Sequence, residues 1–340
     1  MRNVLFMLDN DTRSEGVILK QRITWIDLCK GFAIILVILG HSYSANNGLL
    51  IWLNSFHMPL FFMITGFLMG MRRIYDRPIK KVFFDNLRSL MIPYFVCSIL
   101  LTLFIQFLRT RGEDGFVSGV AGSLKYVFML YGNSPMWFLS CLFLAELLLV
   151  LLHRLPGTVR IILVLAGLIA GVWLPHDITL IALLCRVLRA VFFLTVGELL
   201  SSVEIDKYRL LFIPMLAAQL FLSQWNASDL EFGNSRIAFI VCALLGSIAV
   251  ILFFAGFLKD AKLRLLEYYG ENTLTILCTH PFIVEIIRLA DYKVLDSKIS
   301  GLGIAEGIVI TLIVLIVEIP VIWIVTKYLP ILAGKKRATT

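Results

Sequence analysis

The stretch from Ile23 to Tyr43 reads ITWIDLCKGFAIILVILGHSY. A helix that crosses a bilayer needs roughly 20 mostly apolar residues, and this stretch supplies them. Its ionisable interruptions are Asp27, Lys30 and His41. The stretch therefore predicts a membrane-spanning helix near the start of the chain, with the bilayer as its solvent.

The rest of the chain repeats this apolar pattern. Of its 340 residues, 59% are hydrophobic and 16% are charged, whereas soluble domains have roughly 25% charged residues. The mean hydropathy of +0.89 excludes a soluble globular or a disordered protein. We predict an all-α integral membrane protein with about ten transmembrane helices. The ten runs are Ile23 to Tyr43, Leu50 to Met71, Leu90 to Leu108, Met136 to Leu152, Arg160 to Leu174, Ile178 to Leu200, Leu210 to Trp225, Ile237 to Leu258, Thr273 to Leu289, and Ile304 to Tyr328.

The basic residues predict the orientation of these runs. Most of the 31 Lys and Arg fall in segments that share one side of the membrane if both termini are cytoplasmic, as the positive-inside rule favours. We therefore expect a cytoplasmic segment at 1–22, a membrane domain at 23–329 and a basic cytoplasmic tail at 330–340. The net charge of +8 reflects this sorting. No compact basic module with interleaved aromatics indicates nucleic-acid binding. The predicted location is the cytoplasmic (inner) membrane.

Ionisable residues inside the apolar runs are the first candidates for function. Each costs at least ~2.5–3.5 kcal/mol near the centre of a bilayer, so each needs a reason to be there. They are Asp27, Lys30, His41, His57, Glu146, Arg186, Arg189, Glu198, His280, Glu285 and Glu318.

Lys30 and His41 share one face of the first predicted helix. They are eleven residues apart, which is three helical turns and roughly 16 Å. Asp27 precedes Lys30 by three residues and can pair with it. The alternative is that Lys30 extends to the membrane interface and His41 merely ends the helix.

The second run contains another histidine beside a helix-breaking residue. Pro59 follows His57 by two residues and leaves a backbone carbonyl without its donor, which a membrane helix accepts only where other groups satisfy it. Two imidazoles near a broken helix indicate a site. We predict no metal, because no third ligand stands at a useful spacing. The six cysteines lie in or beside apolar runs without CxxC spacing and are predicted to be buried.

Several motifs together resemble a known family. They are the segment from Arg22 to His41, FHMPLFF (56–62), GFL (66–68), Arg88 with IPY (92–94), PMWFL (135–139), and GENTL (270–274) running to His280 and Pro281. The chain resembles the membrane-bound acyltransferase 3 family, in particular its fucose 4-O-acetylase-like branch. The spacing of a cation and a histidine at Lys30 and His41 is the family's signature.

The resemblance implies transfer of an acyl group, usually acetyl from acetyl-CoA, to a hydroxyl of a cell-envelope polysaccharide or its lipid-linked precursor. Acetyl-CoA would be a substrate, and no bound cofactor is expected. Many members carry an additional extracytoplasmic domain. This sequence ends eleven residues after Leu329, so we expect the membrane domain itself to complete the transfer.

The chemistry assigns roles to the candidates. Histidine, with an unperturbed pKa of about 6.5, is suited to accept a hydroxyl proton, so His41 is the predicted general base or, less favoured, a transient acyl carrier. The predicted donor-binding residues are Lys30, Arg22, Asp27, Arg72, Arg73 and Arg88. The predicted acceptor-binding residues are His57, Asn54 and Trp137. Further candidates are Glu146, Arg186, Arg189 and His280.

Other interpretations remain open at this stage. Arg186 and Arg189 could meet a phosphate or form structural ion pairs with Glu146 or Glu318. His153 is expected to be solvated at a loop edge. A polytopic transporter or flippase of acyl or glycan intermediates is the main alternative, although no pair of interrupted spans in matching halves supports it. A membrane subunit without turnover is the third possibility.

Overall fold

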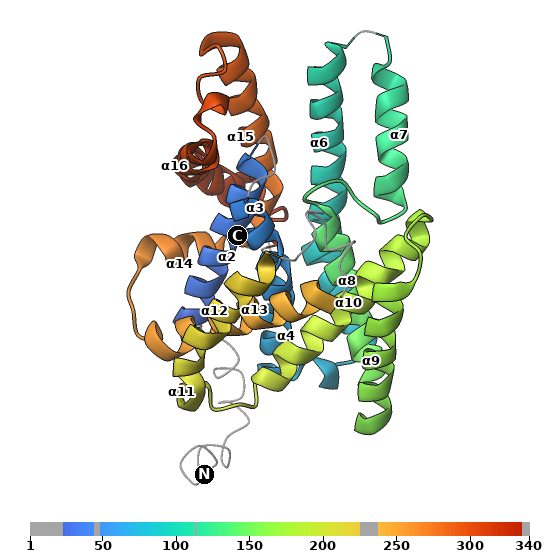
Figure 1. Cartoon of the computed structure of the whole chain (residues 1–340). Helices are drawn as coiled ribbons and strands as arrows, with labels where there is room; N and C mark the ends of the chain where they lie inside the picture. Colours follow the sequence, from blue (N-terminus) through green and yellow to red (C-terminus); the bar gives the residue numbers. More distant parts are fainter. Residues whose placement is uncertain (1–22, 44–47, 113, 225–236, 335–340) are drawn as a thin grey trace.

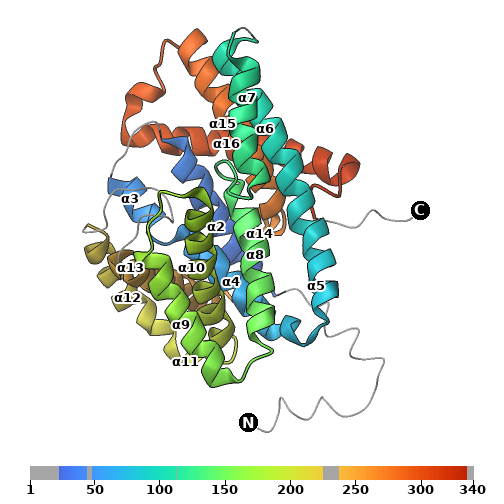
Figure 2. The same ribbon diagram turned by 90° about the vertical axis from the view of Figure 1, so that its right-hand side faces the viewer.

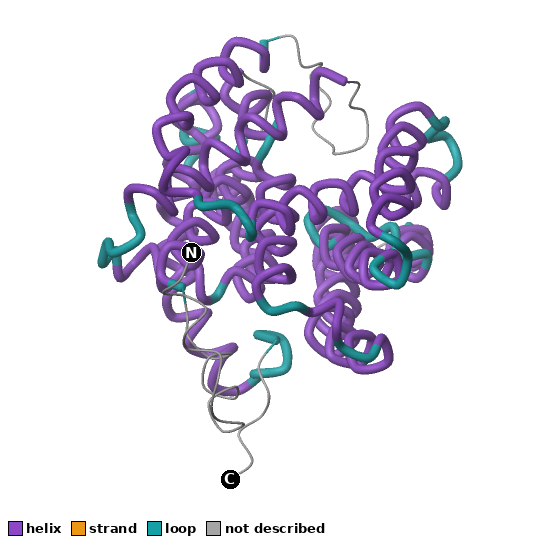
Figure 3. The backbone as a smooth tube through the Cα atoms, turned by 90° about the horizontal axis from the view of Figure 1, so that it is seen from below, coloured by secondary structure: helices purple, strands orange, loops and turns teal. Residues whose placement is uncertain are grey.

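The structure, a computed structural model, describes residues 23–43, 48–112, 114–224 and 237–334. Within these ranges the chain is helical and forms no strand (Figure 3). The helices are α2 (Thr24–Ser42), α3 (Gly48–Asn54), α4 (His57–Met71), α5 (Ile79–Asn86), α6 (Ile92–Thr110), α7 (Phe116–Phe128), α8 (Trp137–Leu152), α9 (Gly157–Trp173), α10 (Thr179–Leu200), α11 (Ile205–Tyr208), α12 (Phe212–Ser223), α13 (Ile237–Phe257), α14 (Arg264–Glu271), α15 (Thr273–Val294) and α16 (Ile304–Tyr328).

Each of the ten predicted apolar runs contains a helix, but the helices differ in length. Seven helical segments are long and apolar enough to cross a membrane: Thr24–Ser42, Gly48–Met71, Ile79–Thr110, Thr179–Leu200, Ile237–Phe257, Thr273–Val294 and Ile304–Tyr328. The remaining runs form α8, α9 and α12, with 16, 17 and 12 residues. The count of ten crossings and the orientation of the termini stay predictions.

A further apolar helix, α7, was not among the predicted runs. It packs against α6 as a hairpin that stands at one end of the molecule (Figure 1). Tyr94 of α6 donates from its hydroxyl to the carbonyl of Val127 at 2.7 Å. This hydrogen bond fixes the base of the hairpin.

The outer helices expose apolar side chains, as a bilayer solvent requires. On α9 the exposed residues include Ile162, Ile169 and Trp173, and on α16 they include Leu312 and Ile316. Exposed apolar faces of this extent on long helices fit lipid contact. The structure thus agrees with a multi-pass membrane protein.

Glycines bring two pairs of central helices into close contact. At Gly66 of α4, an added Cβ would lie 1.9 Å from the carbonyl oxygen of Leu194 in α10. At Gly270 of α14, an added Cβ would lie 1.7 Å from the carbonyl oxygen of Asp27 in α2. Small residues let membrane helices approach this closely, so these crossings fix α2 and α4 at the centre.

The second run is broken in two, as Pro59 predicts. The break lies at Ser55 and Phe56, between α3 and α4. Gln219 of α12 donates to the Ser55 hydroxyl at 2.7 Å, and Ser247 of α13 donates to the carbonyl of Phe56 at 3.2 Å. Side chains of α12 and α13 therefore form hydrogen bonds with polar atoms at the break.

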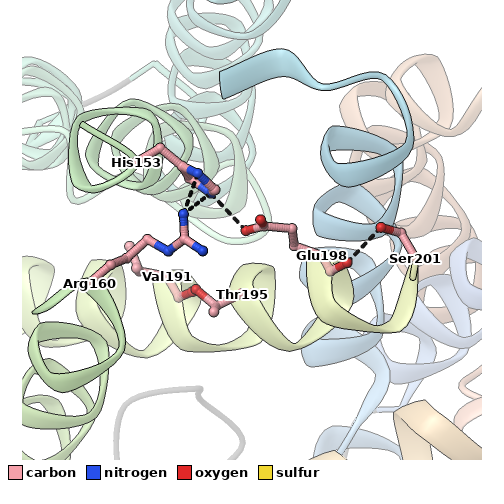
Figure 4. A network of polar contacts seen from close by, with 6 residues as sticks. All are labelled: His153, Arg160, Val191, Thr195, Glu198 and Ser201. Carbon is pink, nitrogen blue, oxygen red and sulfur yellow. Dashed lines mark hydrogen bonds and ion pairs between the residues drawn. The ribbon is translucent and has the colours of Figure 1, made fainter. Parts of the chain in front are cut away.

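His153 is not solvated, and the expectation for it is wrong. Its side chain is 7% exposed, and its Nε2 lies 2.9 Å from Oε2 of Glu198. The ring stacks on Tyr75. Its contacts with Glu198 and Arg160 link α8, α9 and α10 (Figure 4). Glu198, one of the ionisable residues inside the predicted spans, thus pairs with His153 where α8, α9 and α10 meet.

Candidate active site

One face of α2 carries the predicted signature and lines a cavity. Lys30, Ile34 and Val37 lie on this face and border the cavity, and His41 lies one turn beyond Val37. The cavity has a volume of about 270 Å³. Its walls also come from α4, α8 and α15. The face of α2 that the helical spacing predicts therefore forms one wall of this cavity.

The lining of this cavity is mostly apolar. Phe61 of α4, Leu142 of α8 and Leu277 of α15 are typical of its walls. Its polar side chains are Lys30, Thr65, Ser89 and Thr273. A space of this kind suits an elongated, largely apolar group with a few hydrogen-bonding atoms.

Lys30 also lines a second, polar pocket. This pocket has a volume of about 180 Å³ and includes Asp27, Arg72 and Glu271. Lys30 Nζ lies 2.7 Å from Oδ1 of Asp27, which is the predicted pairing. Lys30 therefore stands where a polar pocket and an apolar cavity meet.

The other predicted donor-binding cations do not gather there. Arg73 is exposed and pairs with Asp76 at 2.7 Å. Arg88 is exposed as well and lies on the π-helical turn Leu87–Met91 between α5 and α6. Arg22 lies outside the described residues. Of the predicted donor set, the structure brings together Lys30, Asp27 and Arg72.

The π-helical turn was not predicted from the sequence. It joins α5 to α6 in one continuous rod, seen along the right of the molecule in Figure 2. Ser89 and Leu90 of this turn line the cavity. Such turns occur often at functional sites because they redirect side chains within a helix.

Two histidines meet at the other end of α2. The ring centroids of His41 and His280 are 5.3 Å apart, with the planes tilted by 43°. His280 lies one turn beyond Leu277, which lines the cavity. The histidine pair therefore stands one helical turn past the cavity, at the end away from Lys30.

Arg288 holds the end of α2 against α15. Its Nη2 donates to the carbonyls of His41 at 3.0 Å and Tyr43 at 2.9 Å. A cation at these carbonyls also interacts favourably with the helix dipole. The sequence analysis did not single out Arg288. The sequence feature that could have identified Arg288 is its position two helical turns after His280, on the same face of α15.

His57 and Asn54 lie near this end of α2. His57 is buried, and its Nδ1 donates to the carbonyl of Leu53 at 2.7 Å. The side-chain oxygen of Asn54 approaches α2 at Gly40, 3.7 Å from the place of an added Cβ. Asn54 thus lies beside the residue of α2 that precedes His41, and His57 begins the next helix three residues later.

Trp137 contacts a different partner. The guanidinium of Arg186 lies 5.3 Å from the Trp137 ring centroid and 4.0 Å from that of Tyr131. Arg186 Nη2 also donates to the Tyr131 hydroxyl at 2.8 Å. The guanidinium of Arg186 is therefore within cation–π range of two aromatic rings, one just before α8 and one at its first residue.

The suggested ion pairs of the buried arginines with Glu146 or Glu318 are wrong. Glu146 accepts a hydrogen bond from Asn86 at 2.7 Å, and Glu318 accepts one from Thr279 at 2.8 Å. Arg189 donates from Nε to the carbonyl of Cys185, one turn earlier on α10. Glu318 links α15 to α16, and Glu146 links α8 to α5.

The six cysteines are buried, as predicted. In the part of the chain that the structure describes, no three His, Cys, Asp or Glu side chains gather as metal ligands would. The candidate site therefore consists of a cation, an apolar cavity and a histidine pair.

Comparison with known proteins identifies the family. The family model of an acyltransferase domain, that of acyltransferase 3, matches residues 23–332. No curated protein and no solved structure matches the chain. The matched range contains every helix described above, including both ends of the Lys30–His41 face. The chain therefore belongs to the acyltransferase 3 family and is a membrane acyltransferase.

Proposed function

We propose that this chain transfers an acetyl group from cytosolic acetyl-CoA to a sugar hydroxyl of a cell-envelope polysaccharide or its lipid-linked precursor, in the inner membrane. The main support is the cavity on the Lys30–His41 face. It links a polar pocket that contains cations to the neighbourhood of a histidine pair.

The donor suits the Lys30 end of the cavity. Coenzyme A carries phosphates, which Lys30 and Arg72 would attract. Its pantetheine arm is long and largely apolar with two amides, and the cavity offers apolar walls with the hydroxyls of Thr65 and Thr273. The rise of α2 from Lys30 to His41, roughly 16 Å, is a span that such an arm can bridge.

In this proposal His41 is the general base of the acetyl transfer. One nitrogen of its ring takes the proton of the sugar hydroxyl while the hydroxyl oxygen attacks the thioester carbonyl. The tetrahedral intermediate then collapses, the carbon–sulfur bond breaks, and the coenzyme A thiolate takes the proton back from His41. The products are the acetyl ester and coenzyme A, and the histidine returns to its starting state.

The acceptor would bind beyond the histidine pair. Asn54 and His57 offer polar groups for sugar hydroxyls. Trp137, whose ring stands beside Arg186, would offer an aromatic face to the C–H surface of a further part of the glycan. In this arrangement donor and acceptor reach His41 from opposite ends of α2. The fucose 4-O-acetylase-like branch fits such an acceptor.

Transfer of label tests the proposal. The protein in nanodiscs is incubated with acetyl-labelled acetyl-CoA and envelope glycan, and the glycan is assayed for label. We expect transfer by the wild type, loss of transfer in His41→Ala, and normal transfer in the control His176→Ala, which changes a half-buried loop histidine. Accumulation of substrate inside proteoliposomes without acetylation would instead identify a transporter.

A further inference from the structure

We propose that His280 is a positioning residue that orients the ring of His41 for proton transfer. In this arrangement the Nε2 lone pair of His280 accepts the N–H of one His41 nitrogen. The other His41 nitrogen is then left to accept the hydroxyl proton. The inference rests on the proposed role of His41 as the general base.

The first support is the tautomer of His280. Its Nδ1 lies 2.7 Å from the carbonyl oxygen of Ile276, one turn earlier on α15. A carbonyl can only accept a hydrogen bond, so Nδ1 carries the proton. In the neutral ring Nε2 then has a free lone pair, and it points away from its own helix.

The second support is that this lone pair is buried without a partner. His280 is fully buried, and its Nε2 makes no hydrogen bond to any of the described residues. Buried acceptors in folded proteins are nearly always satisfied, and an exception calls for an explanation. A group that bonds during catalysis is such an explanation.

The third support is the distance to His41. Two imidazoles joined edge to edge by an N–H···N bond of ~2.9 Å have ring centroids roughly 5 Å apart. The observed separation is 5.3 Å, with a tilt of 43°. No hydrogen bond between the two rings is among the described contacts. The His41 ring must therefore rotate before a hydrogen bond to His280 can form. Catalytic hydrogen bonds commonly tighten only when substrate is bound.

The fourth support is that α15 also holds the backbone of His41. Arg288 binds the carbonyls of His41 and Tyr43. Since Arg288 and His280 lie on the same face of α15, one helix fixes the main chain of His41 and faces its ring. With its backbone held, His41 can still rotate its imidazole ring, and a hydrogen bond to His280 would fix the orientation of that ring.

The proton balance follows from this geometry. When His41 accepts the hydroxyl proton it becomes an imidazolium, with one N–H directed at His280 Nε2 and the other at the leaving sulfur. The second proton goes to the thiolate as the carbon–sulfur bond breaks. The Nδ1 proton of His280 stays on Nδ1 throughout, where it is donated to the Ile276 carbonyl, so His280 neither gains nor loses a proton.

Two conservative variants separate positioning from packing. In His280→Gln, the side-chain oxygen can take the place of Nε2, so an acceptor remains. In His280→Asn, the shorter amide can still donate to the Ile276 carbonyl but leaves no acceptor at the Nε2 position. We expect His280→Asn to lower kcat roughly 10- to 100-fold, the size of a lost hydrogen bond to a charged group. The KM for acetyl-CoA should be unchanged, and His280→Gln should restore most of kcat.

The melting temperature of each variant in detergent shows whether the fold is kept. If either variant fails to fold, nitrogen–nitrogen coupling between His41 and His280 is measured by NMR on the ¹⁵N-histidine-labelled wild type, bound to a thioether analogue of acetyl-CoA. Wild-type kcat in His280→Asn, equal losses in both variants, or absence of that coupling would overturn the inference. No transfer by the wild type would instead refute the proposed function itself.

Discussion

A methyl group added at Gly270 tests whether the position of Lys30 depends on the crossing of α2 and α14. The Cβ of alanine would lie 1.7 Å from the Asp27 carbonyl oxygen and 2.6 Å from its carbonyl carbon. Ordinary contact begins near 3.4 Å, so the two helices must separate by about 1.7 Å. The obstacle is backbone, which cannot rotate aside as a side chain would.

The expected effect is larger on turnover than on folding. Overpacking of this kind costs roughly 1–3 kcal/mol of stability. Because Asp27 pairs with Lys30, the shift also moves the cation between the two pockets. A misplacement of about 1 Å in a catalytic assembly can cost roughly 10²-fold in rate. Gly270→Ala should therefore melt at a lower temperature and transfer acetyl groups about 100-fold more slowly.

The measurements are thermal unfolding in detergent and label transfer from acetyl-CoA in nanodiscs. The matched control is Gly122→Ala on α7, where an added Cβ meets nothing within 4 Å. Because Gly122 is an exposed helical position, Gly122→Ala should raise the free energy of unfolding by up to about 1 kcal/mol and leave turnover unchanged. Wild-type melting and turnover in Gly270→Ala would refute the reasoning that the close crossing positions Lys30.

Three further changes test other parts of the site. Lys30→Met should raise the KM for acetyl-CoA by roughly tenfold, from the loss of a charge-assisted contact, and leave the KM of the acceptor unchanged; a donor KM equal to that of the wild type would exclude the proposed role. Arg288→Ala should lower the free energy of unfolding by roughly 1–3 kcal/mol, since two part-buried carbonyls lose their donor, whereas the exposed Arg73→Ala should change the melting temperature little; equal melting of the two variants would contradict this. With both termini cytoplasmic, Lys80→Cys should react with an impermeant thiol reagent only from the cytoplasmic side and Lys298→Cys only from outside, and the buried native cysteines should stay silent. The reverse labelling pattern would invert the topology and require acylation on the cytoplasmic side.

Features that follow from spacing along one helix could be predicted from the sequence. Lys30 and His41 share a face because eleven residues make three turns, and that face lines the cavity. The pairing of Asp27 with Lys30 follows from a spacing of three residues. The break before His57 follows from Pro59, which cannot donate a backbone hydrogen bond.

Features that depend on how helices pack could not be predicted in this way. His280 is 239 residues after His41, and only the arrangement of α2 and α15 brings their rings within 5.3 Å. Opposite charges inside spans suggested ion pairs for Glu146 and Glu318. Each carboxylate instead accepts a hydrogen bond from an uncharged neighbour, and no sequence pattern indicates that choice.

The π-helical turn at Leu87–Met91 sets the rotational phase between α5 and α6. A π-turn accommodates one residue more than an α-turn, and one residue corresponds to roughly 100° of rotation in an α-helix. Deleting a single residue there would convert the rod to regular α-helix and turn Ser89 or Leu90 out of the cavity wall. It would also rotate the basic side chains of α5 relative to the apolar face of α6. Chain length in this segment is therefore under a stricter constraint than residue identity, and a one-residue deletion should disrupt it more than most substitutions.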